Sequence, residues 1–223
     1  MIKHPTLVAG GILGAFAIAG VGLVVLTNTL TTERIATNQR EAMLSKFRAI
    51  LPTEPVSGAP LMDNDPLQDR IQVSAPDLLG APSTEVYRVR QAGQPVAVIL
   101  TPVVPDGYSG PIRLLVAVKP DGTLGGVRVI EHHETPGLGD KIEERKNDWI
   151  KVQFDGKALG QPAEERWLVK RDGGDFDQFT GATITPRSIV KAVKNSLKFV
   201  AREGSALYDR PAMAADATGK EAS

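Results

Sequence analysis

Residues 177–185 read Asp-Gln-Phe-Thr-Gly-Ala-Thr-Ile-Thr and stand directly before an amphipathic segment that ends near Arg202. Thr185 is the expected N-cap of a helix, with Pro186 at the first helical position, where a missing N–H costs nothing. The apolar face of this helix is formed by Ile189, Val193, Leu197 and Val200. The stretch therefore predicts a glycine-containing turn that opens a long helix from Pro186 to about Arg202.

A turn of this composition at a helix start suits a phosphate group. The first N–H groups of a helix lack intrahelical partners, and the helix dipole favours negative charge there. The hydroxyl of Thr183 is placed to contact such a phosphate or to be joined to it. The same residues also fit a plain tight turn with an N-cap, so this stretch alone leaves both interpretations open.

The composition excludes several classes of protein. The chain has 223 residues with 26 basic and 26 acidic side chains, so its overall charge does not favour nucleic acid. The absence of cysteine excludes disulfides, thiolate-held iron–sulfur clusters and c-type haem attachment on this chain. A basic stripe on the C-terminal helix is interpreted as solvated surface; it comprises Arg187, Lys191, Lys194, Lys198 and Arg202.

Residues 5–32 carry no charge, and their core from Leu7 to Thr27 is almost wholly apolar. About 20 helical residues span the ~30 Å hydrocarbon layer of a bilayer. A cleaved signal peptide is the alternative, but its apolar run is shorter, and the following TNTLTTER offers no small-residue cleavage site. We therefore predict an uncleaved transmembrane helix in residues 1–30. The charges on its two sides leave its orientation open.

Residues 31–82 are predicted to be a helical stalk followed by a linker. Glu33–Leu51 has the periodicity of a helix and is expected to continue the membrane helix. Six prolines lie between positions 52 and 82, which predicts irregular chain without a regular element.

Residues 83–204 are predicted to form a domain of the α+β class. Most of its strands are expected in one antiparallel sheet, at Glu85–Arg90, Val96–Leu100, Ile112–Val118 and Gly126–Glu131. A short helix over Lys141–Trp149 and a strand around Arg166–Lys170 are expected before the C-terminal helix. Residues 205–223, rich in alanine and polar residues, are predicted to be a disordered tail.

A second motif, HHETPGLGD over residues 132–140, lies between a predicted strand and the short helix. Pro136 and two glycines make a compact loop whose backbone can approach a flat ligand. Two histidines and a glutamate lie together, but adjacent residues rarely converge on one ion, so no metal site is predicted. Hydrolysis by a Ser or Thr nucleophile with His132 is also weakly supported, because the Gly-x-Ser-x-Gly elbow is missing.

Together the two motifs resemble the FMN-binding domain family, which is shared by the G subunit of the Rnf (or Rsx) electron-transport complex and the C subunit of the sodium-pumping NADH:quinone oxidoreductase. Two longer segments are similar to the Rnf protein in particular, namely GDKIEERKNDWI at 139–150 and KRDGGDFDQFTGATITPRSIV at 170–190. The order of membrane helix, proline-rich stretch and domain is similar too. The resemblance is weak in residues 31–80 and absent in the tail.

In that family FMN is joined through its phosphate to the last threonine of Asp-x-x-Ser/Thr-Gly-Ala-Thr, and a flavin transferase makes the bond from FAD. The resemblance therefore implies that Thr183 is the attachment residue. Thr185 lies beyond the motif, and we assign it to capping and phosphate contact. Further implied FMN contacts are Asp177, Thr180, Gly181, Ala182, His132, Glu134, Thr135, Pro136, Gly137, Leu138 and Gly139. Tyr108, in a glycine-bounded loop, fits a flavin contact or an ordinary core or surface position.

The resemblance implies an electron-carrying subunit of a membrane-bound, ion-translocating ferredoxin:NAD oxidoreductase, with no catalytic residue beyond the flavin. The implied partners are the other membrane and peripheral subunits of the complex, the flavin transferase and membrane lipid. The implied location is the inner membrane, with the N-terminus cytoplasmic and the domain periplasmic.

Two alternatives stay open at this point. The C subunit of the sodium-pumping enzyme is disfavoured by the short chain and by the segment 139–150. A membrane-anchored binding or scaffold module without flavin is disfavoured by the intact Asp-x-x-Thr-Gly-Ala-Thr pattern.

Overall fold

The structure is a computed structural model that describes residues 5–51 and 62–213. The chain divides into two compact units, Met1–Lys46 and Phe47–Ser223. The described residues of the first unit form a single helical segment, and the second unit holds the sheet and both motifs.

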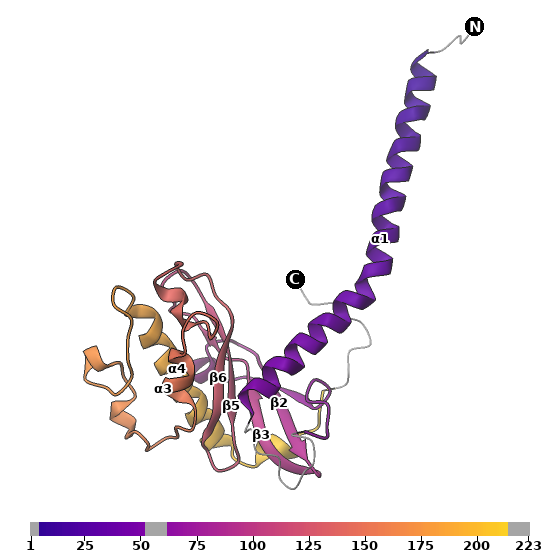
Figure 1. Cartoon of the computed structure of the whole chain (residues 1–223). Helices are drawn as coiled ribbons and strands as arrows, with labels where there is room; N and C mark the ends of the chain where they lie inside the picture. The colour runs from indigo at the N-terminus through magenta and orange to yellow at the C-terminus, as the bar shows by residue number, and fades with distance from the viewer. Residues whose placement is uncertain (1–4, 52–61, 214–223) are drawn as a thin grey trace. The chain divides into compact units, whose positions relative to one another are not determined.

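The helix α1 (Pro5–Ile50) runs without interruption for 46 residues (Figure 1). Its large apolar side chains between Val8 and Ile35 are exposed, as at Leu13 and Phe16, which are each 74% accessible. The hydroxyls of Thr27 and Thr31 donate hydrogen bonds to the carbonyls four residues earlier, at 2.8 and 2.7 Å. These polar groups are therefore satisfied within the helix. The length and hydropathy of α1 are those of a single membrane anchor, and the expected helical continuation over residues 33–50 is confirmed.

Among the residues of the second unit that the structure describes, six strands form one antiparallel sheet. Their order is β1-β2-β3-β5-β4, with β6 also paired with β5. The bounds are β1 Arg70–Val73, β2 Thr84–Gln91, β3 Gln94–Leu100, β4 Val103–Val104, β5 Ile112–Val118 and β6 Leu124–Glu131. The antiparallel sheet and all four strands predicted for it are confirmed, and β1 and β4 are additional.

The centre of this sheet is buried on both faces. Leu114 and Val116 of β5 face the main core, while their neighbours Leu115 and Ala117 are buried on the opposite side. Phe47, at the end of α1 and inside the second unit, packs on that opposite side with its ring 4.9 Å from the ring of Tyr87. Burial on both faces explains why Val96–Leu100 of β3 and Leu114–Val118 of β5 are continuously apolar and do not alternate with polar residues.

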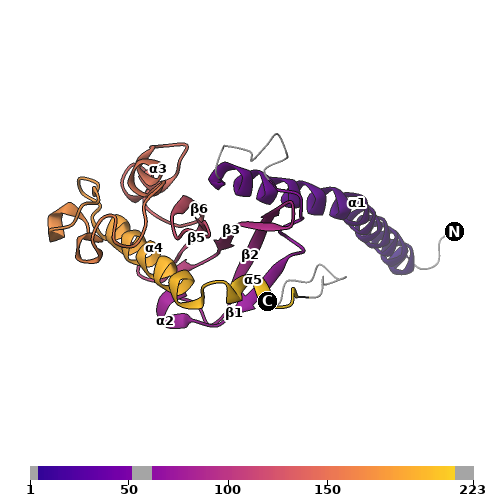
Figure 2. The ribbon, with the colours of Figure 1, turned by 90° about the horizontal axis from the view of Figure 1, so that it is seen from below.

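The helix α4 (Ile184–Glu203) covers the main core, and Figure 2 shows it along the sheet with α2 (Pro76–Leu79) beside it. The predicted apolar face is confirmed, because Ile189, Val193 and Leu197 are at most 2% exposed. Each buried aliphatic side chain of this kind contributes about 1.5–3 kcal/mol of transfer free energy. The other helices are η2 Gly139–Ile142, α3 Trp149–Phe154, η3 Glu164–Arg166, η4 Lys170–Asp172 and α5 Ala206–Asp209.

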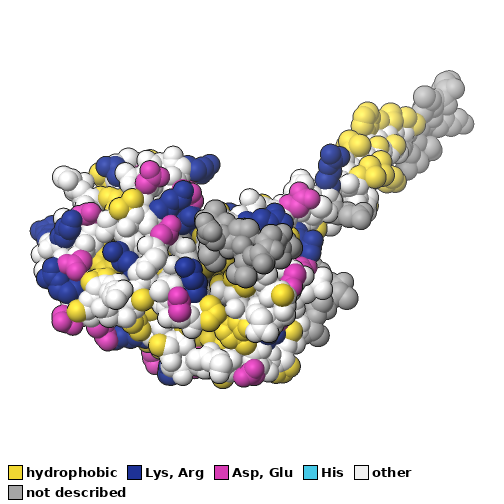
Figure 3. All heavy atoms as spheres, turned by 60° about the horizontal axis from the view of Figure 1, so that its bottom comes forward, with side chains coloured by type: hydrophobic (Ala, Val, Ile, Leu, Met, Phe, Trp, Pro, Cys, Tyr) yellow, Lys and Arg dark blue, Asp and Glu magenta, His cyan; other side chains and the backbone are white. Residues whose placement is uncertain are grey.

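Basic side chains on α4 take part in ion pairs. The pairs are Arg187 with Asp172, Lys191 with Asp106, Lys198 with Glu164 and Arg202 with Glu203. Basic and acidic side chains are interspersed over the face of the domain visible in Figure 3. The stripe is thus a solvated and largely neutralised surface, as the sequence indicated.

The predictions of two elements inside the domain, one helix and one strand, are wrong. The expected helix over Lys141–Trp149 is replaced by η2 and turns, and α3 begins only at Trp149, whose N–H bonds to Asn147 Oδ1 at 2.7 Å. The expected strand around Arg166–Lys170 is replaced by η3 and η4, and only Val169 makes a bridge, to Phe176. Trp167 and Val169 are buried separately in the core and Leu168 is exposed, so the apolar spacing of this segment does not reflect strand pairing.

Two segments interpreted as irregular contain regular elements. Within residues 62–82, β1 pairs with β2 through Ile71 and Val73, and α2 begins at a proline, so that interpretation is wrong for these positions. Within the expected tail, α5 buries Leu207, and Met213 N–H bonds to Arg70 O at 2.8 Å. The remainder of both predictions, residues 52–61 and 214–223, lies outside the described residues.

Candidate functional site

The two motifs meet at a cavity of about 240 Å³. Three segments line it. They contribute Tyr108 from the loop before β5, then Glu134, Thr135, Leu138 and Gly139, and finally Gly181, Ala182, Thr183, Ile184 and Thr185. Residues far apart in the chain are thus brought together as the pairing of motifs predicted.

The helix at this cavity begins two residues earlier than predicted. Thr183 is the N-cap and α4 starts at Ile184, so the assignment of Thr185 as N-cap and Pro186 as first helical residue is wrong. A proline is tolerated throughout the first turn, because none of the first-turn N–H groups has an intrahelical partner. The proline therefore located the helix start only to within one turn. The Thr183 side chain makes no capping hydrogen bond.

A tight turn fixes the position of Thr183. Ala182 N–H bonds to Phe179 O at 3.1 Å, and Gly181 between them has φ +82°, a conformation that favours glycine. Phe179 anchors the turn, because its ring lies 5.1 Å from the buried ring of Trp149. The half-buried Thr183 follows directly on the cavity wall.

The start of α4 is chemically suited to a phosphate. The N–H groups of Ile184 and Thr185 belong to the first turn, where no carbonyl of the helix accepts them, while Pro186 has none to offer. The small side chains of Gly181 and Ala182 leave the approach open. A phosphate joined to Thr183 would meet two donors and the positive end of a helix of 20 residues.

Glu134 lines the cavity but is buried, with 4% of its surface exposed. Its Oε1 accepts the Ser109 N–H at 3.1 Å, and its Oε2 accepts the Thr185 hydroxyl at 2.5 Å. Thr185 itself is fully buried. A Cβ at Gly139 would lie 2.5 Å from Glu134 Oε2, so only glycine fits there without a shift.

Hydrogen bonds and ion pairs hold the segment from His132 to Lys146 in place. His132 Nδ1 accepts the Glu134 N–H at 3.0 Å, and His132 Nε2 lies 3.0 Å from Glu143 Oε1. Lys146 bridges Asp140 at 2.7 Å and Glu143 at 2.9 Å. Hydrogen bonds from Lys146, Arg145 and His132 lower the pKa of Glu143 to about 2, and Lys146 also lowers the pKa of Asp140.

Five of the residues assigned to FMN do not line the cavity: Asp177, Thr180, His132, Pro136 and Gly137. Asp177 instead ties the turn to α3. Its N–H bonds to Gln153 Oε1 at 2.9 Å and its carbonyl accepts the Trp149 indole N–H at 2.9 Å. Whether these residues contact FMN stays a prediction.

The mouth of the cavity is apolar and exposed. Tyr108, Leu138 and Ile184 line the cavity and are 67%, 44% and 45% accessible. Ile184 is absent from the predicted site residues, although an apolar residue between two threonines at a helix start was a usable signal. Large exposed apolar side chains gathered at a cavity often mark a contact surface.

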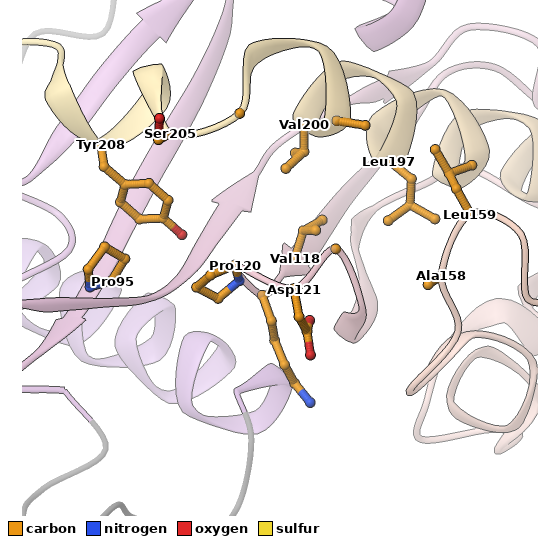
Figure 4. A pocket seen from close by; sticks show the side chains of 14 residues that line it. Pro95, Val118, Pro120, Asp121, Ala158, Leu159, Leu197, Val200, Ser205 and Tyr208 are labelled. Carbon is orange, nitrogen blue, oxygen red and sulfur yellow. The ribbon is translucent and has the colours of Figure 1, made fainter.

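A larger cavity of about 510 Å³ lies elsewhere, between the end of α4, the β5–β6 turn and α5 (Figure 4). Its lining includes Val118, Leu197, Val200 and Tyr208. Burial raises the pKa of Tyr208 to about 12. Neither motif contributes a residue to this cavity, so its size does not make it the functional site.

Comparison with known proteins identifies two matching families. Residues 107–198 match the model described as an FMN-binding domain, and residues 1–50 match that described as the RnfG N-terminal region. The first match covers both motifs and the whole cavity lining. The second covers α1.

Similar proteins span nearly the whole chain. The G subunit of the ion-translocating oxidoreductase complex of Pseudomonas aeruginosa is 51% identical over 189 residues, which cover 84% of this chain and 85% of that protein. The protein of the same name from Shewanella baltica is 40% identical over 94% of this chain and 96% of its own length. That from Vibrio atlanticus is 41% identical over 91% and 93%.

Proposed function

The chain belongs to the family of G subunits of ion-translocating oxidoreductase complexes, and from this we propose that it carries electrons in such a complex through FMN joined to Thr183 by a phosphoester. The complex is proposed to be a ferredoxin:NAD oxidoreductase whose outer redox substrates bind other subunits. This chain would hold the cofactor and the membrane anchor.

The position of Thr183 is the observation that supports this proposal most strongly. Its hydroxyl lies at the N-cap of α4 without serving as a cap, and the residue lines the cavity where both motifs meet. A hydroxyl that is free of capping is available for esterification, and the helix start stabilises the phosphate charge that follows.

The remaining lining fits the rest of FMN. The N–H groups of Ile184 and Thr185 would bind phosphate oxygens, and Gly181 and Ala182 leave room for the chain that joins phosphate to ring. Tyr108, Leu138 and Ile184 offer exposed apolar surface to a flat ring. FMN would supply reversible one- and two-electron chemistry, which a phosphate linkage leaves unaltered because the ring carries no new bond.

The proposed partners are the other membrane and peripheral subunits of the complex, membrane lipid around α1, and a flavin transferase during maturation. We place the domain on the periplasmic side and the N-terminus in the cytoplasm. A tethered cofactor suits that side, because a flavin lost from the site could not be recovered from the cytoplasmic pool.

Attachment is tested on the full chain, produced with and without a flavin transferase and purified in detergent. The proposal predicts one added FMN per chain by intact mass, present only with the transferase, and flavin fluorescence that survives denaturing electrophoresis. Flavin that separates completely from the chain on denaturation would contradict a covalent link.

Orientation is tested by labelling, because the chain has no native cysteine to interfere. Glu165→Cys, at an exposed position of η3, should react with a membrane-impermeant maleimide in cells whose outer membrane is permeabilised. Lys3→Cys, before α1, should react only after the inner membrane is lysed. The reverse pattern would place the domain in the cytoplasm.

A further inference from the structure

We propose that Glu134 is a positioning residue that acts through Thr185 to hold Thr183 in place for modification and flavin binding. The inference rests on the proposed attachment at Thr183. It assigns to Glu134, which lines the cavity, the role of fixing the helix start in addition to any contact with FMN.

Glu134 joins all three segments that form the cavity. Its own backbone belongs to the first motif, its Oε1 holds the loop at Ser109, and its Oε2 holds the first turn of α4 at Thr185. Both bonds form in a place where Glu134 is 4% exposed and Thr185 is fully buried. Water is therefore a poor substitute for either partner, and loss of one leaves a buried polar group unsatisfied.

The geometry of α4 connects this bond to Thr183. Thr185 is the second residue of the helix and Thr183 is its N-cap, so the two belong to one turn of backbone. Arg187 N–H closes that turn on Thr183 O at 3.2 Å. Fixing the Thr185 side chain consequently fixes the start of the helix, where the reactive hydroxyl and the first-turn N–H groups lie.

Glu134 is itself held from behind. Its N–H donates to His132 Nδ1, and His132 is bonded in turn to Glu143, which Lys146 fixes. His132 does not line the cavity. These contacts assign His132 a supporting role for the Glu134 backbone and explain why a histidine can be useful in this motif without touching a flavin.

The test compares attachment rates in the full chain with purified flavin transferase and FAD. Glu134→Ala and Thr185→Val each remove the bond and should slow attachment about tenfold or more. Thr185→Ser keeps the hydroxyl and should attach FMN within about twofold of the wild-type rate. Glu134→Gln should also stay close to wild type, because its oxygen can accept from Ser109 while its amide donates to Thr185 Oγ1.

The double variant decides whether Glu134 acts through Thr185. The double variant Glu134→Ala with Thr185→Val should attach FMN no more slowly than Glu134→Ala alone. The first substitution already removes the bond between residues 134 and 185, so the second removes nothing further. If the slowing in the double variant equalled the product of the slowing in the two single variants, the proposal would be contradicted. Equal slowing of Glu134→Gln and Glu134→Ala would show that the charge, not the hydrogen-bond geometry, is what matters, which also overturns it.

Hydrogen–deuterium exchange on the FMN-free chain supplies a readout that does not need attachment. Glu134→Ala should raise exchange in residues 107–110 and 183–187 while strands β3 and β5 stay protected. Unchanged exchange in both segments, or a uniform rise over the domain, would overturn the positioning role. If wild type took no FMN, the proposed function would fail, and this measurement would still decide whether Glu134 holds the helix start.

Discussion

The Thr185 hydroxyl donates to Glu134 Oε2 at 2.5 Å and so joins two motifs that are 51 positions apart in the chain. The backbone of residue 139 lies so close to the Glu134 carboxylate that only glycine fits at this position without a shift. The bond also separates two roles within the second motif. Thr183 and Thr185 both line the cavity, but Thr183 is half-buried and makes no capping bond, while Thr185 is fully buried and bonded to Glu134.

Gly139→Ala should destabilise the domain by about 2–3 kcal/mol, because its Cβ would lie 2.5 Å from Glu134 Oε2 and 3.1 Å from Thr185 Oγ1. Gly137→Ala is the matched control in the same loop. It meets open space and has φ +79°, so it should cost only about 1 kcal/mol of backbone strain. Denaturant unfolding of the full chain in detergent measures both. Equal losses would show that the contact with Glu134 is not tight.

The domain should lose stability as the pH falls from about 4.5 to about 2, the window set by the lowered pKa of Glu143. A carboxylate whose pKa is lowered on folding stabilises the fold above its unfolded pKa and loses that contribution through its folded pKa. Lys146→Met returns the pKa values of Glu143 and Asp140 toward ordinary ones. The drop in unfolding free energy from about pH 6 to about pH 3 should therefore be smaller than in wild type.

Lys141→Met is the control for this pH dependence, because within the described residues Lys141 is in no ion pair with either carboxylate. Its pH profile should match that of wild type. A Lys146→Met profile that also matched wild type would contradict the bracing of the segment by this lysine.

Arg88→Met should cost about 2 kcal/mol of unfolding free energy, because it removes a buried guanidinium that bonds to Asp69 and to two carbonyls, while Asp69 keeps its pair with Arg90. The Arg88 side chain is 4% exposed, pairs with Asp69 and bonds to the carbonyls of Tyr208 and Arg210, which fastens the C-terminal segment to β2. Arg113→Met removes a pair with Glu131 whose side chains are 60% and 59% exposed, and should cost less than about 1 kcal/mol. Thermal or denaturant unfolding compares the unfolding free energies of the two variants. A small loss of stability in Arg88→Met, similar to that in Arg113→Met, would contradict the anchoring role of Arg88.

The sheet was predictable because burial leaves a direct mark on its sequence. Leu114–Val118 is a continuous apolar run, and the predicted strand Ile112–Val118 lies between Pro111 and Pro120; the structure gives β5 the predicted bounds. The segment around Arg166–Lys170 also contains consecutive apolar residues. Trp167 and Val169 are buried in the core, but the segment pairs with other chain only through the single bridge from Val169 to Phe176. Local pattern cannot tell these cases apart, because pairing depends on distant chain.

The candidate site was predictable as two motifs but not as a network. Nothing local in the sequence indicates that Glu134 faces Thr185, or that His132 supports the loop from behind. The helix start was misplaced because Pro186 suits any position of the first turn. The resulting change matters for function, because it moves the N-cap from Thr185 to Thr183.

The most direct test of the account is peptide-level mass spectrometry of the full chain produced with a flavin transferase. The FMN mass should lie on Thr183, be lost in Thr183→Ala, and persist in Thr180→Ala, since Thr180 does not line the cavity. FMN found on Thr180 or Thr185, or retained covalently in Thr183→Ala, would contradict the central claim.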